Sequence, residues 1–102
     1  MAKLVALYRK PANATAFDAY YSSTHAPLAK KIPGLRRYEV SVGAVTTPQG
    51  DSPYHLVAIL GFDSAAAIKQ ALSSPEGRAT ADDLANFAQA GVELLVFDSK
   101  EV

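Results

Sequence analysis

Three short segments of this chain carry apolar side chains at consecutive positions, and this feature constrains the fold more than any other. They cover residues 4–8, 54–62 and 92–98. Successive side chains of a β-strand point to opposite faces of its sheet, so each of these predicted strands needs apolar cover on both faces. The chain must therefore build a sheet that is buried on both sides.

A fourth strand is predicted over residues 35–45, where polar and apolar side chains alternate. Residues 46–53 consist of turn-forming types, including Pro48, Gly50 and Pro53. The strand at 54–62 follows at once, so we expect it to return antiparallel and to form a long hairpin.

Helical spacing of apolar residues predicts a first helix that begins at a cap, Asn13 or Thr15. Pro27 interrupts this helix, because its ring clashes with the carbonyl four residues earlier and it has no N–H. We expect the helix to break near His25 and to restart with Pro27 at its first position. Two more helices are predicted over residues 65–72 and, from a Ser74 cap, over residues 75–88.

The resulting order, βαββαβ, is that of a ferredoxin-like α+β subunit, with a four-stranded antiparallel sheet and its helices on one face. The length of 102 residues fits a single domain, residues 1–102. One layer of helices leaves the second apolar face uncovered, and a second copy of the sheet is its simplest cover. We therefore expect a homodimer through the sheet face; the alternative is a monomer with a partly exposed apolar sheet.

Charge and cysteine content exclude several classes of partner. Ten basic and ten acidic residues balance, so we expect no nucleic acid and no membrane surface as partner. The absence of cysteine removes disulfides and thiolate nucleophiles and leaves the redox compartment undetermined. The apolar run at residues 4–8 is shorter than a signal-peptide core, so we expect a cytoplasmic protein.

Several motifs together resemble the EthD family, named for a protein of bacterial ethyl tert-butyl ether degradation. They are Tyr20-Tyr21 with His25-Ala26-Pro27-Leu28, Ile32-Pro33-Gly34-Leu35, Ser74-Pro75-Glu76-Gly77 and residues 83–88. The resemblance covers nearly the whole chain and implies a dimeric α+β barrel with a cleft between helices and sheet that binds small organic molecules. It implies no single reaction, because that superfamily spans monooxygenases, polyketide cyclases, lactone isomerases and haem-degrading enzymes.

His25 is the strongest candidate for chemistry, because a predicted helix break frees backbone groups and aims a side chain into a cleft. Its functional interpretation is a general acid or base acting on a hydroxyl, an enol or an α-proton. The alternative is a structural histidine that bonds the free backbone groups of the break.

Tyrosine is frequent in this chain, which has five tyrosines and no tryptophan. A phenol lines an apolar pocket while donating one directed hydrogen bond, although core packing is the alternative for each. We predict Tyr8 as a second catalytic residue. The predicted ligand-binding residues are Tyr20, Tyr54, Asn86 and Phe87. His55 follows Tyr54 on a strand, so we expect the two to face opposite sides and not to line one pocket.

No metal and no cofactor are expected. The two histidines lie thirty residues apart without a known ligand spacing, and no phosphate loop or dinucleotide motif occurs. Asp82 and Asp83 are not expected to form a catalytic pair, because neighbours point to different sides of a helix.

The leading hypothesis is an EthD-like protein that binds a small, apolar, oxygenated molecule, with a cofactor-free cyclase, isomerase or monooxygenase reaction and His25 as acid–base residue. A non-catalytic accessory or binding protein of a degradation pathway is the alternative. A haem-handling barrel is a third interpretation, weakened because neither histidine lies in a ligation motif.

Overall fold

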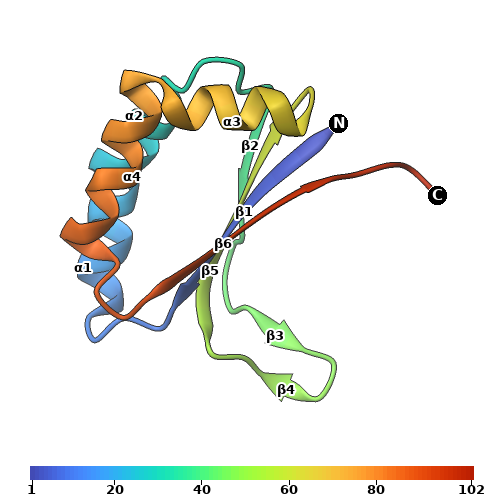
Figure 1. Cartoon of the computed structure of the whole chain (residues 1–102). Helices are drawn as coiled ribbons and strands as arrows, with labels where there is room; N and C mark the ends of the chain where they lie inside the picture. The colour runs from blue at the N-terminus through green and yellow to red at the C-terminus, as the bar shows by residue number, and fades with distance from the viewer.

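A computed structural model describes all residues, 1–102. Figure 1 shows a layer of helices on one side of a twisted sheet and a small hairpin that projects from one end. The elements in chain order are β1 (Ala2–Arg9), α1 (Ala14–Tyr20), the π-helical turn η1 (Tyr21–His25), α2 (Ala26–Ala29), β2 (Arg37–Val40), β3 (Thr46–Thr47), β4 (Gly50–Asp51), β5 (Tyr54–Phe62), α3 (Ala65–Ser73), α4 (Pro75–Phe87) and β6 (Val92–Asp98). None of the helices has the length and apolar character needed to cross a membrane.

The main sheet has the strand order β2-β5-β1-β6 with every pair antiparallel. Leu4 of β1 lies opposite Leu60 of β5 and Val96 of β6, so the two central strands carry the core. The order and direction of the strands confirm the predicted ferredoxin-like α+β fold. The predicted bounds of the last two strands, residues 54–62 and 92–98, are also confirmed.

The two faces of the sheet differ sharply in burial. Along β1 the even-numbered residues are buried beneath the helices, while Lys3, Val5 and Leu7 remain partly exposed on the other side. The edge strand β6 differs from β1, because both of its faces are open: Leu94 and Val96 on the helix side are 50% and 49% exposed, and Leu95 and Phe97 on the other side are 49% and 45% exposed. The open sheet face, as we call it, has an apolar centre that consists of Val5, Leu7, Val57, Ile59, Leu95 and Phe97. The charged residues Lys3, Arg37, Glu39 and Glu93 lie on the same face around them.

The first helix is irregular at the predicted position, near His25, but it does not break there as predicted. The backbone stays in the right-handed helical region from Ala14 through Ala29. It widens into η1, where the N–H of Ala26 donates to the carbonyl of Tyr21, five residues earlier. Pro27 follows directly in the first turn of α2, after the turn in which the hydrogen-bond spacing changes. The wider turn replaces the break because it accommodates proline without opening the helix.

The hairpin is shorter within the main sheet than predicted for residues 35–45. β2 ends at Val40, and the chain leaves the sheet at Gly43, which adopts a positive φ of 75°. It then forms the separate β3–β4 ladder, in which Thr46 pairs with Asp51. This small hairpin projects away from the helical layer (Figure 1).

Caps predicted from sequence hold the helices in place. The side chain of Asn13 accepts from the N–H of Ala16, and the side chain of Ser74 accepts from the N–H of Gly77. Pro75 occupies the first turn of α4 as predicted. Gly77 also lies so close to α3 that an added Cβ would be 2.0 Å from the Ala71 carbonyl oxygen. The tight α3–α4 corner positions α4 across the end of η1.

Candidate functional site

A buried histidine–aspartate pair lies between the helical layer and the sheet. His25 closes η1 and is only 3% exposed. Its Nδ1 lies 2.9 Å from Oδ2 of Asp83, which comes from the inner face of α4 and is 6% exposed. A charged acceptor at Nδ1 fixes the tautomer with the proton on Nδ1 and leaves Nε2 with a free lone pair.

Asp83 is held by further donors on the side away from the sheet. The hydroxyl of Tyr20 donates to Oδ1 at 2.6 Å, and Nδ2 of Asn86 donates to the same oxygen at 3.0 Å. Burial by itself raises the pKa of Asp83, but the bonds from Tyr20, Asn86 and His25 outweigh it and lower this pKa below its usual value. The carboxylate therefore stays ionised beside the imidazole.

His25 remains neutral near pH 7. Burial lowers its pKa below the usual value, and this effect exceeds the opposing influence of Asp83. Its Nε2 lies 3.4 Å from the hydroxyl of Tyr8 on β1. Burial raises the pKa of Tyr8, so the phenol keeps its proton. The site thus presents a basic nitrogen and a phenolic donor side by side.

Aromatic rings surround the pair and exclude water from it. The ring of Phe87 lies 4.6 Å from that of His25, and Phe87 also packs against Tyr8 at 5.6 Å. Tyr21 contacts His25 and its hydroxyl lies 2.5 Å from the hydroxyl of Tyr38 on β2. Electrostatic interactions strengthen in such a dry setting.

Beside Nε2 of His25 lies a cavity of about 60 Å³. Apart from Tyr8, Tyr21, Tyr38, His25 and Thr80, its walls are aliphatic or glycine; they include Leu4, Ala6, Ala29, Ile32, Ala58 and Leu60. The volume is well below the ~150 Å³ that holds a benzene ring in an engineered cavity. All buried side-chain polar atoms have hydrogen-bond partners.

The structure brings five of the six predicted site residues together. His25, Tyr8 and Phe87 meet directly. Tyr20 and Asn86 join them through Asp83 and do not line the cavity. The ring nitrogens of His25 contact side chains, which differs from the backbone repair considered as its alternative.

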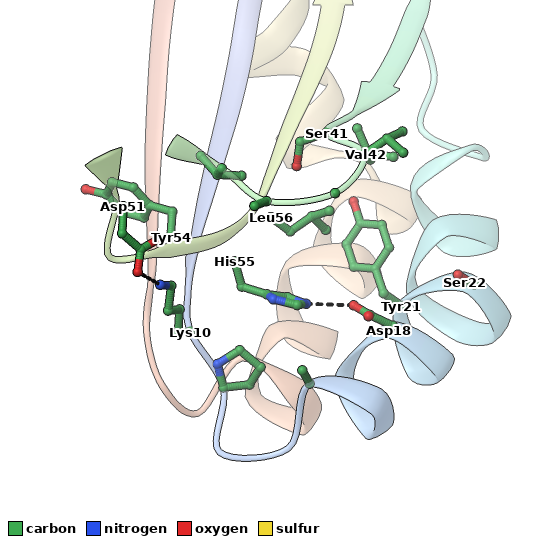
Figure 2. A pocket seen from close by; sticks show the side chains of 16 residues that line it. Lys10, Asp18, Tyr21, Ser22, Ser41, Val42, Asp51, Tyr54, His55 and Leu56 are labelled. Atoms are coloured by element: carbon green, nitrogen blue, oxygen red, sulfur yellow. Dashed lines mark hydrogen bonds and ion pairs between the residues drawn. The ribbon is translucent and has the colours of Figure 1, made fainter. Parts of the chain in front are cut away.

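Tyr54 lies apart, at the start of β5, where its hydroxyl donates to Glu93 of β6. It borders an open groove of about 630 Å³ between α1, the start of β5 and residues 40–45. His55 borders the same groove and reaches Oδ1 of Asp18 on α1 at 2.7 Å (Figure 2). The prediction that Tyr54 and His55 line no common pocket was therefore wrong. The strand pairing shifts by one residue at this point, and the groove receives side chains from the end of the strand.

Comparison with known proteins identifies a family that matches this chain and solved structures that share its fold. Residues 9–91 match the EthD domain. The chain belongs to the EthD family. An uncharacterised 11.0 kDa protein from the thcB-thcC intergenic region of Rhodococcus erythropolis is 40% identical over 103 residues, which cover 100% of this chain and 98% of the relative. The crystal structure of an EthD family protein from Bacillus halodurans is 37% identical, with a TM-score of 0.90 over 98% of this chain and 99% of that one.

Two more distant structures share the fold of this EthD protein. One is a dimeric ferredoxin-like protein of unknown function from Thermobifida fusca, with a TM-score of 0.69 and 16% identity over 94% of this chain and 88% of that one. The other is SnoaB, a cofactor-independent oxygenase from Streptomyces nogalater, with a TM-score of 0.69 and 17% identity over 99% and 94%. At these identities the likeness concerns the fold.

Asp83 is the site residue of this EthD protein that sequence reasoning missed. From the sequence alone it is a candidate only as a pair with Asp82, whereas in the structure Asp83 lies on the buried side of α4 and bonds to His25. The signal was its spacing, because Thr80, Asp83 and Phe87 recur on one helical face and all three are buried. A carboxylate on an apolar helix face requires a buried partner. No group of three or more histidine, cysteine or acidic side chains is arranged to hold a metal ion.

Proposed function

We propose that this EthD protein binds a small, largely apolar molecule with one hydroxyl or enolisable carbonyl group and that His25 acts on it as general acid and base. A cofactor-free cyclisation, isomerisation or monooxygenation is compatible with this role. Tyr8 would orient the oxygen of the ligand and donate a hydrogen bond to it. Asp83 would hold the imidazole, with Tyr20 and Asn86 as its own positioning residues.

The observation that carries the proposal is the direction of the two imidazole nitrogens. Nδ1 of His25 faces the ionised Asp83, while Nε2 faces Tyr8 and the cavity. A neutral imidazole whose far nitrogen is held by a carboxylate is the arrangement that makes the near nitrogen an effective base. The apolar walls favour an aromatic or aliphatic ligand body.

The shared fold of the Streptomyces nogalater oxygenase supports a reaction without a cofactor. General acid–base chemistry on an acidic ligand C–H or O–H needs only a positioned base and a donor. His25 and Tyr8 supply both in this chain.

A second candidate function, a non-catalytic binding or accessory protein, is favoured by a different observation. The cavity is small, and His25 has side-chain partners at both nitrogens. In that case His25 and Asp83 would only fix the position of η1 against α4, and a bound ligand would be released without reaction.

We also propose that two copies pair through the open sheet face. Val5, Ile59 and Leu95 are adjacent on this face, and they would be covered in a dimer. The shared fold of the dimeric Thermobifida fusca protein supports this arrangement.

Thermal-shift measurements on matched variants test the proposed site. Wild type, His25→Gln and Asp83→Asn would be screened against phenols, quinones, lactones and polyketide-like compounds, with Gln70→Ala at an exposed position of α3 as the control. A compound that binds the folded state raises Tm with its occupancy. We expect at least one class to stabilise wild type and Gln70→Ala but not His25→Gln.

Turnover assays with the stabilising class then separate the two candidates. Conversion that is lost in His25→Gln and Asp83→Asn supports the acid–base role, whereas binding without conversion supports the accessory role. Equal stabilisation of wild type and His25→Gln would place the ligand elsewhere and contradict the proposed site.

A further inference from the structure

The cavity beside His25 is too small for the ligand class proposed above. It measures about 60 Å³, and a single benzene ring needs a cavity of roughly 150 Å³. A phenol therefore reaches Nε2 of His25 only if one wall of the cavity moves. The question is which wall separates the cavity from a space large enough for the rest of the ligand.

Tyr21 is the one residue that borders both the cavity and the open groove. Its ring lies on the cavity side against His25 and Tyr8, and Figure 2 shows it at the edge of the groove above Asp18. The hydroxyl of Tyr21 pairs with that of Tyr38, which also lines the cavity. The two tyrosines thus form a partition between a cavity of about 60 Å³ and a groove of about 630 Å³.

The backbone beneath the partition is suited to movement. Tyr21 begins η1 and His25 ends it, so one irregular turn carries both the partition and the base. A π-helical turn holds its residues by hydrogen bonds to carbonyls five positions earlier and is frequent at functional sites.

We propose that the open groove is the outer part of the His25 ligand site and that Tyr21, bonded to Tyr38, is the partition that a ligand displaces to reach His25. The identity of the ligand rests on the proposed function; the route does not. A groove of this volume lies in the range of small-molecule sites, about 300–1,000 Å³.

The groove selects a neutral ligand with an apolar body. Two pairs of its polar side chains are hydrogen-bonded: Nζ of Lys10 donates to Asp51 at 2.6 Å, and Nε2 of His55 lies 2.7 Å from Oδ1 of Asp18 (Figure 2). No unpaired cation remains there to attract an anionic group. The aliphatic side chains that line the groove are those of Val40, Val42, Ala44, Val45 and Leu56, with Ser41 and Gly43 between them. A flat molecule would place its hydroxyl at Nε2 and its rings along these side chains.

One competing route leads past the rim of the cavity near the edge strand. Leu72 of α3 and Leu94 of β6 border the cavity and are both partly exposed. This rim has no adjoining groove of comparable size, and its side chains make no polar contact with the base. Leu94 therefore supplies the matched control for Tyr21.

Labelling with diethyl pyrocarbonate tests the route without any ligand, because this reagent acylates neutral imidazole. The chain has only two histidines, and peptide mapping by mass spectrometry separates His25 from His55. His55, whose side chain is 22% exposed in the groove, is the internal reference. In wild type we expect His25 to react at least about tenfold more slowly than His55, because its labelling requires local opening.

The expected result is that Tyr21→Ala accelerates labelling of His25 about tenfold, Tyr38→Phe does so to a smaller extent, and Leu94→Ala leaves it unchanged. The rate at His55 and the far-UV circular dichroism spectrum check that each variant is folded. Tyr38→Phe carries the test alone if Tyr21→Ala does not fold, since it removes only one hydroxyl. Acceleration by Leu94→Ala but by neither tyrosine variant would overturn the proposal.

A probe ligand then separates failure of the route from failure of the function. Saturating 1-naphthol is expected to protect His25 and His55 together in wild type. Protection of His25 alone would refute the outer site, although the proposed function would stand. Accelerated labelling in Tyr21→Ala with no protection by any phenol, quinone, lactone or polyketide-like compound would refute the proposed function, although the route would stand.

Discussion

At the scale of single residues, the site depends on a base whose charge is controlled by burial. His25 is almost completely covered, and its pKa is lowered because burial opposes the charged form more strongly than Asp83 favours it. The same burial keeps Tyr8 protonated by raising the pKa of its phenol. Both shifts extend the pH range over which Nε2 of His25 is a free acceptor and the phenol of Tyr8 is a donor.

This balance predicts how stability depends on pH. The pKa of His25 is lower in the folded chain than in the unfolded chain. Below about pH 6.5, His25 is therefore protonated in the unfolded chain while it stays neutral in the folded chain. The free energy of unfolding then falls as pH falls from 7 toward 5, by at most about 1.4 kcal/mol per pH unit for this one proton. Urea unfolding of wild type and His25→Gln across this range measures the difference.

We expect a shallower decline in His25→Gln, since it lacks the buried imidazole while His55 remains in both proteins. Asp83, whose pKa is lowered, stays ionised over this range. Its protonation lowers the free energy of unfolding only at more acidic pH. Parallel curves for the two proteins would contradict a depressed pKa at His25.

At the scale of elements, the α3–α4 corner depends on a glycine for a steric reason. Gly77 lies in the first turn of α4, and a Cβ there would approach the carbonyl oxygen of Ala71 to 2.0 Å. Gly→Ala in a helix ordinarily stabilises by up to about 1 kcal/mol. Here we expect Gly77→Ala to lower the free energy of unfolding by about 2 kcal/mol instead, because backbone must shift.

The matched control is Gly61→Ala on β5, where the nearest atom to an added Cβ is 3.4 Å away and belongs to the side chain of Arg37. Thermal unfolding should show a drop of about 10 °C for Gly77→Ala and little change for Gly61→Ala. A Gly77→Ala protein as stable as wild type would show that the corner is looser than described. Because α4 carries Asp83, we also expect weaker ligand stabilisation in this variant.

Elements were predictable from sequence where local chemistry decides them. The caps at Asn13 and Ser74 and the strands β5 and β6 follow from side-chain type and apolar runs. The π-helical turn was not predictable, since the clash at Pro27 is relieved equally well by a break or by a wider turn. Tertiary contact of His25 with Asp83 accompanies the wider turn. The early end of β2 likewise depends on the positive φ of Gly43.

At the scale of the whole molecule, the residues of the site come from elements far apart in the chain. His25 and Tyr8 could be proposed individually, but Asp83 lies 58 residues from His25, and only the folded helical layer brings them together. The groove was missed for a similar reason, because it forms where α1 meets a strand end and residues 40–45. Sequence periodicity shows which face of an element is buried, whereas it does not show which elements face each other.

The open sheet face is the feature of the whole molecule with the clearest consequence. Apolar faces of this kind are rare on monomers, because water contact with clustered apolar side chains is unfavourable. We expect the chain to have twice its mass of 10.8 kDa in solution.

Ile59 lies on β5 between Val5 and Glu39 of the neighbouring strands. In a sheet-to-sheet dimer, Ile59→Lys would bury a charge in the interface, so this variant should have the mass of the monomer. Light scattering coupled to size exclusion measures both, with Ala66→Lys on the exposed side of α3 as the control that should stay dimeric. Wild type at 10.8 kDa would refute the dimer, and dissociation by Ala66→Lys would instead place the interface on the helical layer.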